Sequence, residues 1–230
     1  MKSLRPQIPC LFVLIFATHS LEAQEWANLN HYREANQQLK STSSSDDLVV
    51  FMGNSITESW IQYDSAFFTE NPFVNRGISG QTSPQMLLRF RSDVIDLEPV
   101  VVVLLAGTND IAGNTGPMTL DMIMANITSM VELAKANDIK VVLCSVLPAA
   151  SFSWRPDLHP AQKIIALNKL IEDYCRLNAV EYLDYHSVMT NPQNGLLDKF
   201  TYDGVHPNET GYKVMSSLVL NSISSVLAAP

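Results

Sequence analysis

The chain has 230 residues, of which 47% are hydrophobic and 17% are charged, and its formal net charge is -8. This size and aliphatic content predict one globular domain with a sizeable core and argue against disorder. The acidic balance provides no basic surface for nucleic acid and no polybasic segment for anionic lipid, so neither partner is expected.

The first 24 residues have the pattern of a secretory signal peptide. Two basic residues precede a short apolar run at 10–17, and a small residue, Ala23, stands at the end of the segment. The apolar run is too short to span a membrane, so no stable membrane insertion is expected. We predict cleavage near Ala23 or Gln24 and a secreted or periplasmic protein. The alternative is a buried N-terminal helix.

Residues 25–47 are expected to form an N-terminal segment, with a short helix at 26–40 and a polar linker at 41–47. From residue 48 onward, apolar runs of strand length alternate with helix-like segments. The strands are predicted at 48–52, 73–75, 100–106, 140–147 and 180–183. The helices are predicted at 58–68, 83–97, 117–137, 160–177 and 209–227, with Ser83 and Asn208 as N-caps of the second and last.

Strands that are apolar throughout and separated by helices indicate a parallel sheet covered on both faces. We therefore predict a three-layer α/β/α domain over residues 48–230, with five parallel strands in the order 2-1-3-4-5. In such a sheet, ligands bind beyond the carboxyl ends of the strands. Motifs that directly follow a strand are accordingly the candidates for a functional site.

Ser55 follows the first strand within the motif Gly-Asn-Ser-Ile-Thr at 53–57. The glycine allows a sharp turn that exposes the hydroxyl at the sheet edge, where a serine becomes a nucleophile if a base is within hydrogen-bond reach. The alternative is structural: Ser55 would be a helix N-cap, and Glu58, three residues later, would complete a capping box.

Asp203 and His206 lie three residues apart in the loop Asp-Gly-Val-His-Pro at 203–207, just before the last helix. A short turn can aim both side chains at one point. The histidine would then take the proton of Ser55, and the aspartate would orient the imidazole. The alternative is an ordinary surface turn, because Asp-Gly and His-Pro both favour turns.

Gly80 and Asn109 are candidate donors to an oxyanion. Asn109 follows the most apolar strand, where its amide can donate to a developing negative oxygen, and Gly80 can present a bare backbone N–H, as can Ser55. The alternatives are a turn glycine at 80 and a helix cap or Asx-turn at Asn109-Asp110. A phosphate loop at 77–82 is excluded because the signature lysine is missing.

These four ordered motifs resemble those of the SGNH hydrolases, also called the GDSL-like lipase/acylhydrolase family, over residues 46–225. Ser55, Gly80 and Asn109 match the first three blocks, and Asp203 with His206 matches the last. The resemblance implies a flavodoxin-like α/β/α fold, hydrolysis of carboxylic esters, and no metal or organic cofactor. One departure is Asn54, where the family usually has Asp, which leaves the local hydrogen bonding of the first block open.

The resulting expectation is a serine esterase that removes short acyl groups, acetyl above all, from carbohydrate. The alternatives are a lysophospholipase or thioesterase, and a non-catalytic carbohydrate-binding module with the same fold. Trp154 is either an aromatic platform for a sugar or a cover for the core. Cys144 and Cys175 are expected to be buried thiols, although export would permit a disulfide. No histidine has the partners that a zinc site needs.

Overall fold

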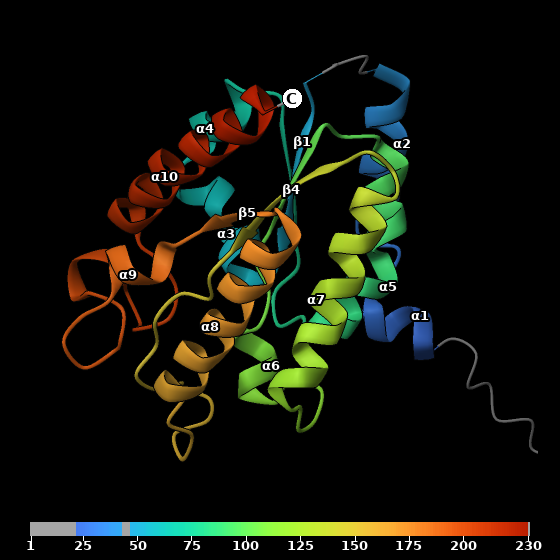
Figure 1. Cartoon of the computed structure of the whole chain (residues 1–230). Coiled ribbons are helices and arrows are strands. Elements are labelled where there is room, and N and C mark those ends of the chain that lie inside the picture. Colours follow the sequence, from blue (N-terminus) through green and yellow to red (C-terminus); the bar gives the residue numbers. More distant parts are fainter. Residues whose placement is uncertain (1–21, 43–46, 230) are drawn as a thin grey trace, which may run out of the picture.

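The computed structural model describes residues 22–42 and 47–229. Most of the predicted signal peptide and residues 43–46 of the predicted linker lie outside this range, so both assignments stay predictions. In the described part, a five-stranded sheet lies between two layers of helices (Figure 1). The predicted three-layer α/β/α architecture is therefore confirmed.

The five strands are all parallel and follow the order β2-β1-β3-β4-β5, as predicted. Their bounds are β1 Val49–Gly53, β2 Phe73–Gly77, β3 Val101–Leu104, β4 Lys140–Cys144 and β5 Glu181–Leu183. Chain order reverses on the two sides of β1, because β2 pairs with one edge of β1 and β3 with the other. This is the topological switch point at which ligands bind in open α/β sheets.

Ten α-helices and two 3₁₀ helices are assigned in the described residues. Their bounds are α1 Glu22–Ala27, α2 Arg33–Thr42, α3 Ser55–Tyr63, α4 Ser65–Thr69, α5 Ser83–Asp93, η1 Ile95–Leu97, α6 Thr108–Ala112, α7 Leu120–Lys135, α8 Ala161–Asn178, α9 Tyr185–Met189, η2 Asp198–Phe200 and α10 Glu209–Ala228. None of these helices combines the length and apolar content that a membrane crossing needs.

Alternate residues of the strands feed two separate cores. In β1, Val50 and Met52 face the core beneath α5, α7 and α8, whereas Val49 and Phe51 face the core beneath α3, α4 and α10. The two helical layers lie on opposite sides of the sheet in Figure 1. Burial on both faces explains why the strands are continuous apolar runs.

Several helix boundaries differ from the prediction. The predicted helix at 58–68 is two helices, α3 and α4, because Asp64 has non-helical backbone angles. Ser83 is the first residue of α5 and not its cap: Thr82 is the cap, and its N–H donates to Gln85 Oε1 at 2.9 Å. The short helices α6 and α9 were not predicted, since five residues are too few to show a helical period.

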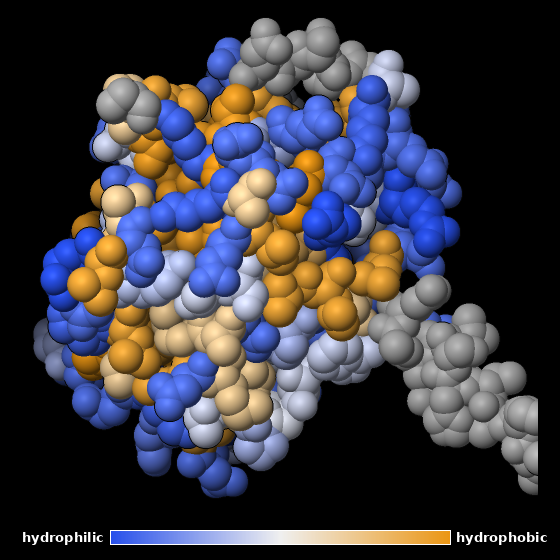
Figure 2. Space-filling view, turned by 45° about the vertical axis from the view of Figure 1, so that its right-hand side comes forward, coloured by the Kyte–Doolittle hydropathy of each residue, from blue (hydrophilic) through white to orange (hydrophobic). Residues whose placement is uncertain are grey.

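Hydrophobic side chains also reach the surface where α1, α5 and α7 come together. Trp26, Leu88 and Met122 are exposed large hydrophobic residues of these helices. Figure 2 shows hydrophobic surface on this face, surrounded by hydrophilic side chains.

Cys144 and Cys175 are buried free thiols, as expected from the sequence.

Candidate active site

The motifs singled out in the sequence converge at the carboxyl ends of β1, β2 and β3. β1 ends at Gly53, and Asn54 caps α3 by accepting a hydrogen bond from the Ile56 N–H at 3.0 Å. Ser55 is therefore the first residue of α3 and not its cap. The neutral amide of Asn54 performs the capping that a carboxylate could also provide.

Ser55, His206 and Asp203 form one continuous chain of hydrogen bonds. Ser55 Oγ lies 2.9 Å from His206 Nε2, and His206 Nδ1 lies 2.7 Å from Asp203 Oδ2. The geometry fits the tautomer in which Nδ1–H donates to the carboxylate and Nε2 accepts from the hydroxyl. Residues 151 positions apart in the sequence are thus in direct contact.

The loop at 201–207 holds the histidine through its own backbone. Asp203 Oδ1 accepts from the N–H groups of Val205 and His206 at 2.9 and 2.7 Å. Thr201 Oγ1 donates to the His206 carbonyl at 2.7 Å and accepts from Gly204 N–H at 2.9 Å. Gly204 has φ +87°, a conformation that glycine adopts without steric cost.

Asp203 is set up to remain ionised. Partial burial opposes its charge, but hydrogen bonds from the backbone and ring of His206 and from the Val205 N–H outweigh this effect, and the pKa of Asp203 lies below its ordinary value. A carboxylate in contact with Nδ1–H can stabilise an imidazolium, so this pair has the arrangement that a general base needs.

The three candidate oxyanion donors are the N–H groups of Ser55 and Gly80 and the amide of Asn109. Gly80 has φ +77°, and no acceptor in the described residues contacts its N–H. The Ser55 N–H lies in the first turn of α3, where no preceding helical carbonyl is available to it. Asn109 Nδ2 donates one hydrogen to the Gln81 carbonyl at 2.9 Å, which fixes the amide beside Gly80 and leaves its second hydrogen for another acceptor.

A fully buried arginine, which sequence reasoning missed, braces this arrangement. Arg89 Nη2 donates to the Gly53 carbonyl at 3.0 Å, Nε donates to Gln81 Oε1 at 2.5 Å, and Nη1 pairs with Asp93 at 3.0 Å. One guanidinium thereby ties the end of β1 to the loop that carries Gly80. The only sequence signal is an Arg and an Asp four residues apart on a helix, which usually marks a surface pair.

Asp110 ties the third motif to the first residue of α5. Its Oδ1 accepts from the Ser83 N–H at 2.9 Å and from the Ser83 hydroxyl at 2.5 Å. Its Oδ2 is buried without a partner in the described residues. Burial raises the pKa of Asp110, although the bonds from Ser83 oppose this shift. The helix-cap alternative therefore describes Asp110 better than it describes Asn109.

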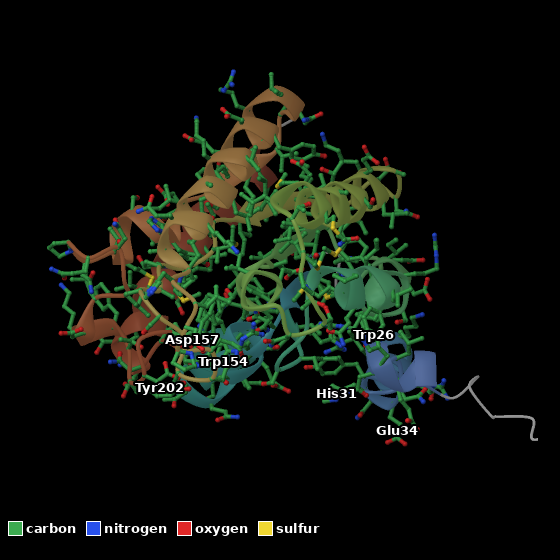
Figure 3. The ribbon with its side chains drawn as sticks, turned by 90° about the horizontal axis from the view of Figure 1, so that it is seen from below. Trp26, His31, Glu34, Trp154, Asp157 and Tyr202 are labelled. Carbon is green, nitrogen blue, oxygen red and sulfur yellow. The ribbon has the colours of Figure 1, made fainter. Side chains whose placement is uncertain are left out.

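Two aromatic side chains flank the imidazole of His206. The ring of Tyr202 stacks on it with centroids 5.9 Å apart, and the ring of Trp154 lies 6.5 Å away. Trp154 also stacks on the buried Phe152 at 4.9 Å and is itself 40% exposed. Figure 3 shows Trp154 and Tyr202 together on this side of the molecule. Trp154 is thus not a core cover alone, because much of its ring is open to solvent.

In the described part of the chain, no metal-ligating cluster accompanies these groups. Within residues 22–42 and 47–229, no three His, Cys, Asp or Glu side chains are grouped so that they could hold an ion. The hydroxyl, imidazole, carboxylate and amide donors of the site are the groups that acyl transfer through a serine uses.

Comparison with known proteins identifies the family. A sequence profile of the GDSL-like Lipase/Acylhydrolase family matches residues 51–214, and the chain belongs to this family. A crystal structure of a candidate acylhydrolase from Bacteroides fragilis is 48% identical, with a TM-score of 0.85 over 88% of this chain and 98% of that one. A GDSL-like lipase from Bacteroides thetaiotaomicron is 47% identical, with a TM-score of 0.85 over 87% of this chain and 99% of that one.

A more distant relative has a stated substrate. An acetylxylan esterase from Xylanibacter ruminicola is 27% identical over 174 residues, which are 65% of this chain but 35% of that protein. The chain thus spans about a third of that relative's length. The family and the similar proteins identify the chain as a carboxylic ester hydrolase. This argues against the alternative of a non-catalytic carbohydrate-binding module.

Proposed function

We propose that the protein is a serine esterase in which Ser55, His206 and Asp203 form the catalytic triad. The observation that carries the proposal is the unbroken hydrogen-bond chain from the Ser55 hydroxyl through His206 to Asp203. The hydroxyl oxygen attacks the ester carbonyl while His206 Nε2 takes its proton. The leaving alcohol then receives that proton, and an acyl group remains on Ser55.

The negative oxygen of the tetrahedral intermediate is stabilised by the N–H groups of Ser55 and Gly80 and by the Asn109 amide. A water molecule activated by His206 then attacks the acyl-enzyme, and the carboxylic acid leaves as Ser55 regains its proton. Loss of one oxyanion donor typically lowers turnover by about 100- to 1,000-fold. No step requires a metal or an organic cofactor.

The proposed substrate is an acetylated carbohydrate. Supporting this are the exposed ring of Trp154 beside His206, which suits the apolar face of a sugar, and the relative that is an acetylxylan esterase. The predicted signal peptide is consistent with an extracellular or periplasmic polymer as the target. The second candidate, a lysophospholipase or thioesterase, is supported by the breadth of the family and by the similarity to a GDSL-like lipase.

The test is hydrolysis of p-nitrophenyl esters of increasing chain length and of acetylated xylan, with the wild type and Ser55→Ala. We expect the rate to be highest for acetate, and Ser55→Ala to lose about 10⁶-fold in turnover while it remains folded, as triad nucleophile removal does elsewhere. Undiminished turnover by Ser55→Ala would refute the triad. A rate that peaks at long acyl chains would favour the second candidate.

A further inference from the structure

A cavity of about 440 Å³ lies beside the candidate active site, between the turn that follows α6 and the loop that leads into α8. Its volume is within the range of small-molecule sites. Its lining includes Asp110, Gly113, Met118, Arg155, Leu158 and Lys163. Two cationic side chains from different segments therefore face one cavity.

Neither cation has an anionic partner in the described part of the chain. In the described residues, neither the Arg155 guanidinium nor the Lys163 ammonium forms a hydrogen bond or an ion pair, and both residues are exposed. Arg155 Nη1 lies 3.6 Å from the point where a Cβ on Gly113 would be, so the guanidinium packs against bare backbone. Two cationic side chains without a partner thus line one cavity of a chain whose net charge is -8.

The carboxylates nearby do not neutralise this pair. Asp110 lines the cavity, but it is 2% exposed, its Oδ1 accepts two bonds from Ser83, and its Oδ2 is buried without a partner in the described residues. Burial raises the pKa of this carboxyl, which favours its neutral form. Asp157 lines an adjoining hollow of about 340 Å³ together with Arg155 and makes no ion pair with it. The cavity therefore offers two donors of positive charge to a ligand.

Hydrogen-bonded side chains connect the surroundings of the cavity to the active site. Trp154 Nε1 donates to Asn114 Oδ1 at 3.3 Å, and Asn114 Nδ2 donates to the Gly80 carbonyl at 3.2 Å. Asn114 directly follows Gly113, and Trp154 directly precedes Arg155. The same tryptophan lies 6.5 Å from the His206 ring. Figure 3 shows Trp154 and Asp157 adjacent at this end of the molecule.

We propose that this cavity binds the carboxylate of an acidic sugar, so that the preferred substrate is an acetylated carbohydrate that carries a carboxylate next to the acetylated unit. The inference rests on the proposed function and specifies its substrate class. The planar fork of Arg155 matches a carboxylate, and Lys163 adds a point charge. Trp154, which precedes Arg155 and lies 6.5 Å from the His206 ring, offers its exposed ring to the sugar between the two sites.

The experiment compares kcat/KM for two acetylated xylo-oligosaccharides that differ only in a glucuronic acid branch, and adds O-acetylated N-acetylneuraminic acid as a second carboxylate-bearing sugar. The variants are Arg155→Met and Lys163→Met. Lys169→Met is the matched control, because it removes the same charge from α8 at a residue already paired with Glu172 and Asp173.

We expect the wild type to prefer the acidic oligosaccharide, and each cavity variant to lower the ratio of acidic to neutral kcat/KM by about ten-fold, the value of one charge-assisted hydrogen bond. The control should retain the wild-type ratio. Hydrolysis of the O-acetylated N-acetylneuraminic acid but not of the glucuronic acid-branched oligosaccharide would identify sialic acid as the sugar that supplies the carboxylate. A wild-type ratio near one, or an equal fall in the control, would overturn the inference while the proposed function stands.

Binding gives a readout that does not depend on turnover. Calorimetry of Ser55→Ala should show tighter binding of the deacetylated acidic oligosaccharide than of the neutral one, with the difference lost when Arg155→Met is added. Equal affinities for the acidic and the neutral oligosaccharide would contradict the inference. If neither acetylated sugar is hydrolysed although p-nitrophenyl acetate is, the carbohydrate assignment itself fails. A dependence on Arg155 seen only with an anionic lysophospholipid would replace the acidic sugar with a lipid phosphate.

Discussion

At the scale of single residues, Asp203 holds His206 in place with one oxygen on the ring and the other on the loop backbone. Asp203→Asn keeps the size of the side chain but removes the charge that orients and stabilises the imidazole. We expect kcat on p-nitrophenyl acetate to fall by roughly 100- to 10,000-fold with little change in KM. Asp157→Asn, at an exposed carboxylate of a nearby loop, is the control. An unaltered kcat would contradict the role of Asp203.

Asp110 allows a prediction about pH and stability. Its pKa is raised by burial, so the folded protein binds the proton more tightly than the unfolded chain does. The unfolding free energy of the wild type relative to Asp110→Asn should therefore decrease as pH rises from about 4, the unfolded value, through the raised folded value. Urea unfolding at several pH values measures this difference, with Asp157→Asn for comparison. Parallel profiles for the wild type and Asp110→Asn would show that burial does not shift this group.

At the scale of elements, the glycine that ends β2 controls how closely α3 approaches the sheet. A Cβ on Gly77 would lie 2.1 Å from the Glu58 N and 2.7 Å from its Cα, and backbone cannot move aside as a side chain can. We expect Gly77→Ala to lower the unfolding free energy by about 3 kcal/mol, because α3 must move away from β2. Ser55 lies at the start of α3, so turnover should also fall.

Gly80→Ala is the comparison for this substitution. Gly80 has φ +77° but no atom within 4 Å of the added methyl group, so only backbone strain of about 1 kcal/mol is expected. Chemical denaturation of the two variants separates steric clash from strain. Equal losses in both would contradict the role of close packing at Gly77.

The sequence was sufficient to predict those helices and strands that arise from a local motif or from a periodic apolar pattern. Runs such as 48–52 and 100–106 are apolar because both faces of the sheet are covered, and they predicted the strands and their order. The break at Asp64 and the shift of the α5 cap to Thr82 were missed, since a continuous helix-like pattern hides a single non-helical residue. The four motifs converge in the structure as their order implied, although the roles of their residues stay predictions.

What could not be read from the sequence depends on contacts between distant segments. Arg89 looks like an ordinary helical arginine, yet it is fully buried and contacts the end of β1, which is 36 residues away. The bond between Asn114 and Gly80 likewise joins two loops that no pattern links. Such interactions exist only once the sheet has brought the loops to one edge.

At the scale of the whole molecule, residues 25–42 are packed against the domain that carries the candidate site. The Tyr32 hydroxyl donates to the Gly77 carbonyl, and Gln81 Nε2 donates to the Ala27 carbonyl at 2.8 Å. Asn36 joins two buried charges: its Oδ1 accepts from Arg76 Nε at 2.8 Å, and its Nδ2 donates to Asp93 at 2.8 Å. The segment thereby supports the loop on which Gly80 lies.

Asn36→Ala tests whether this segment and the domain unfold together. The variant leaves buried Arg76 Nε without a partner and Asp93 Oδ1 with only the Ser92 hydroxyl at 3.3 Å, so we expect a loss of about 1–3 kcal/mol in unfolding free energy. Gln37→Ala, at the exposed neighbouring position, should change it by less than about 0.5 kcal/mol. Tryptophan fluorescence and circular dichroism should give coincident urea transitions in the wild type, because Trp26 belongs to the segment and Trp60 to the core. Equal losses of unfolding free energy in Asn36→Ala and Gln37→Ala, or different urea midpoints for the two probes in the wild type, would show that the segment unfolds independently of the domain. Its bonds to Gly77 and Gln81 could then not stabilise the loop that carries Gly80.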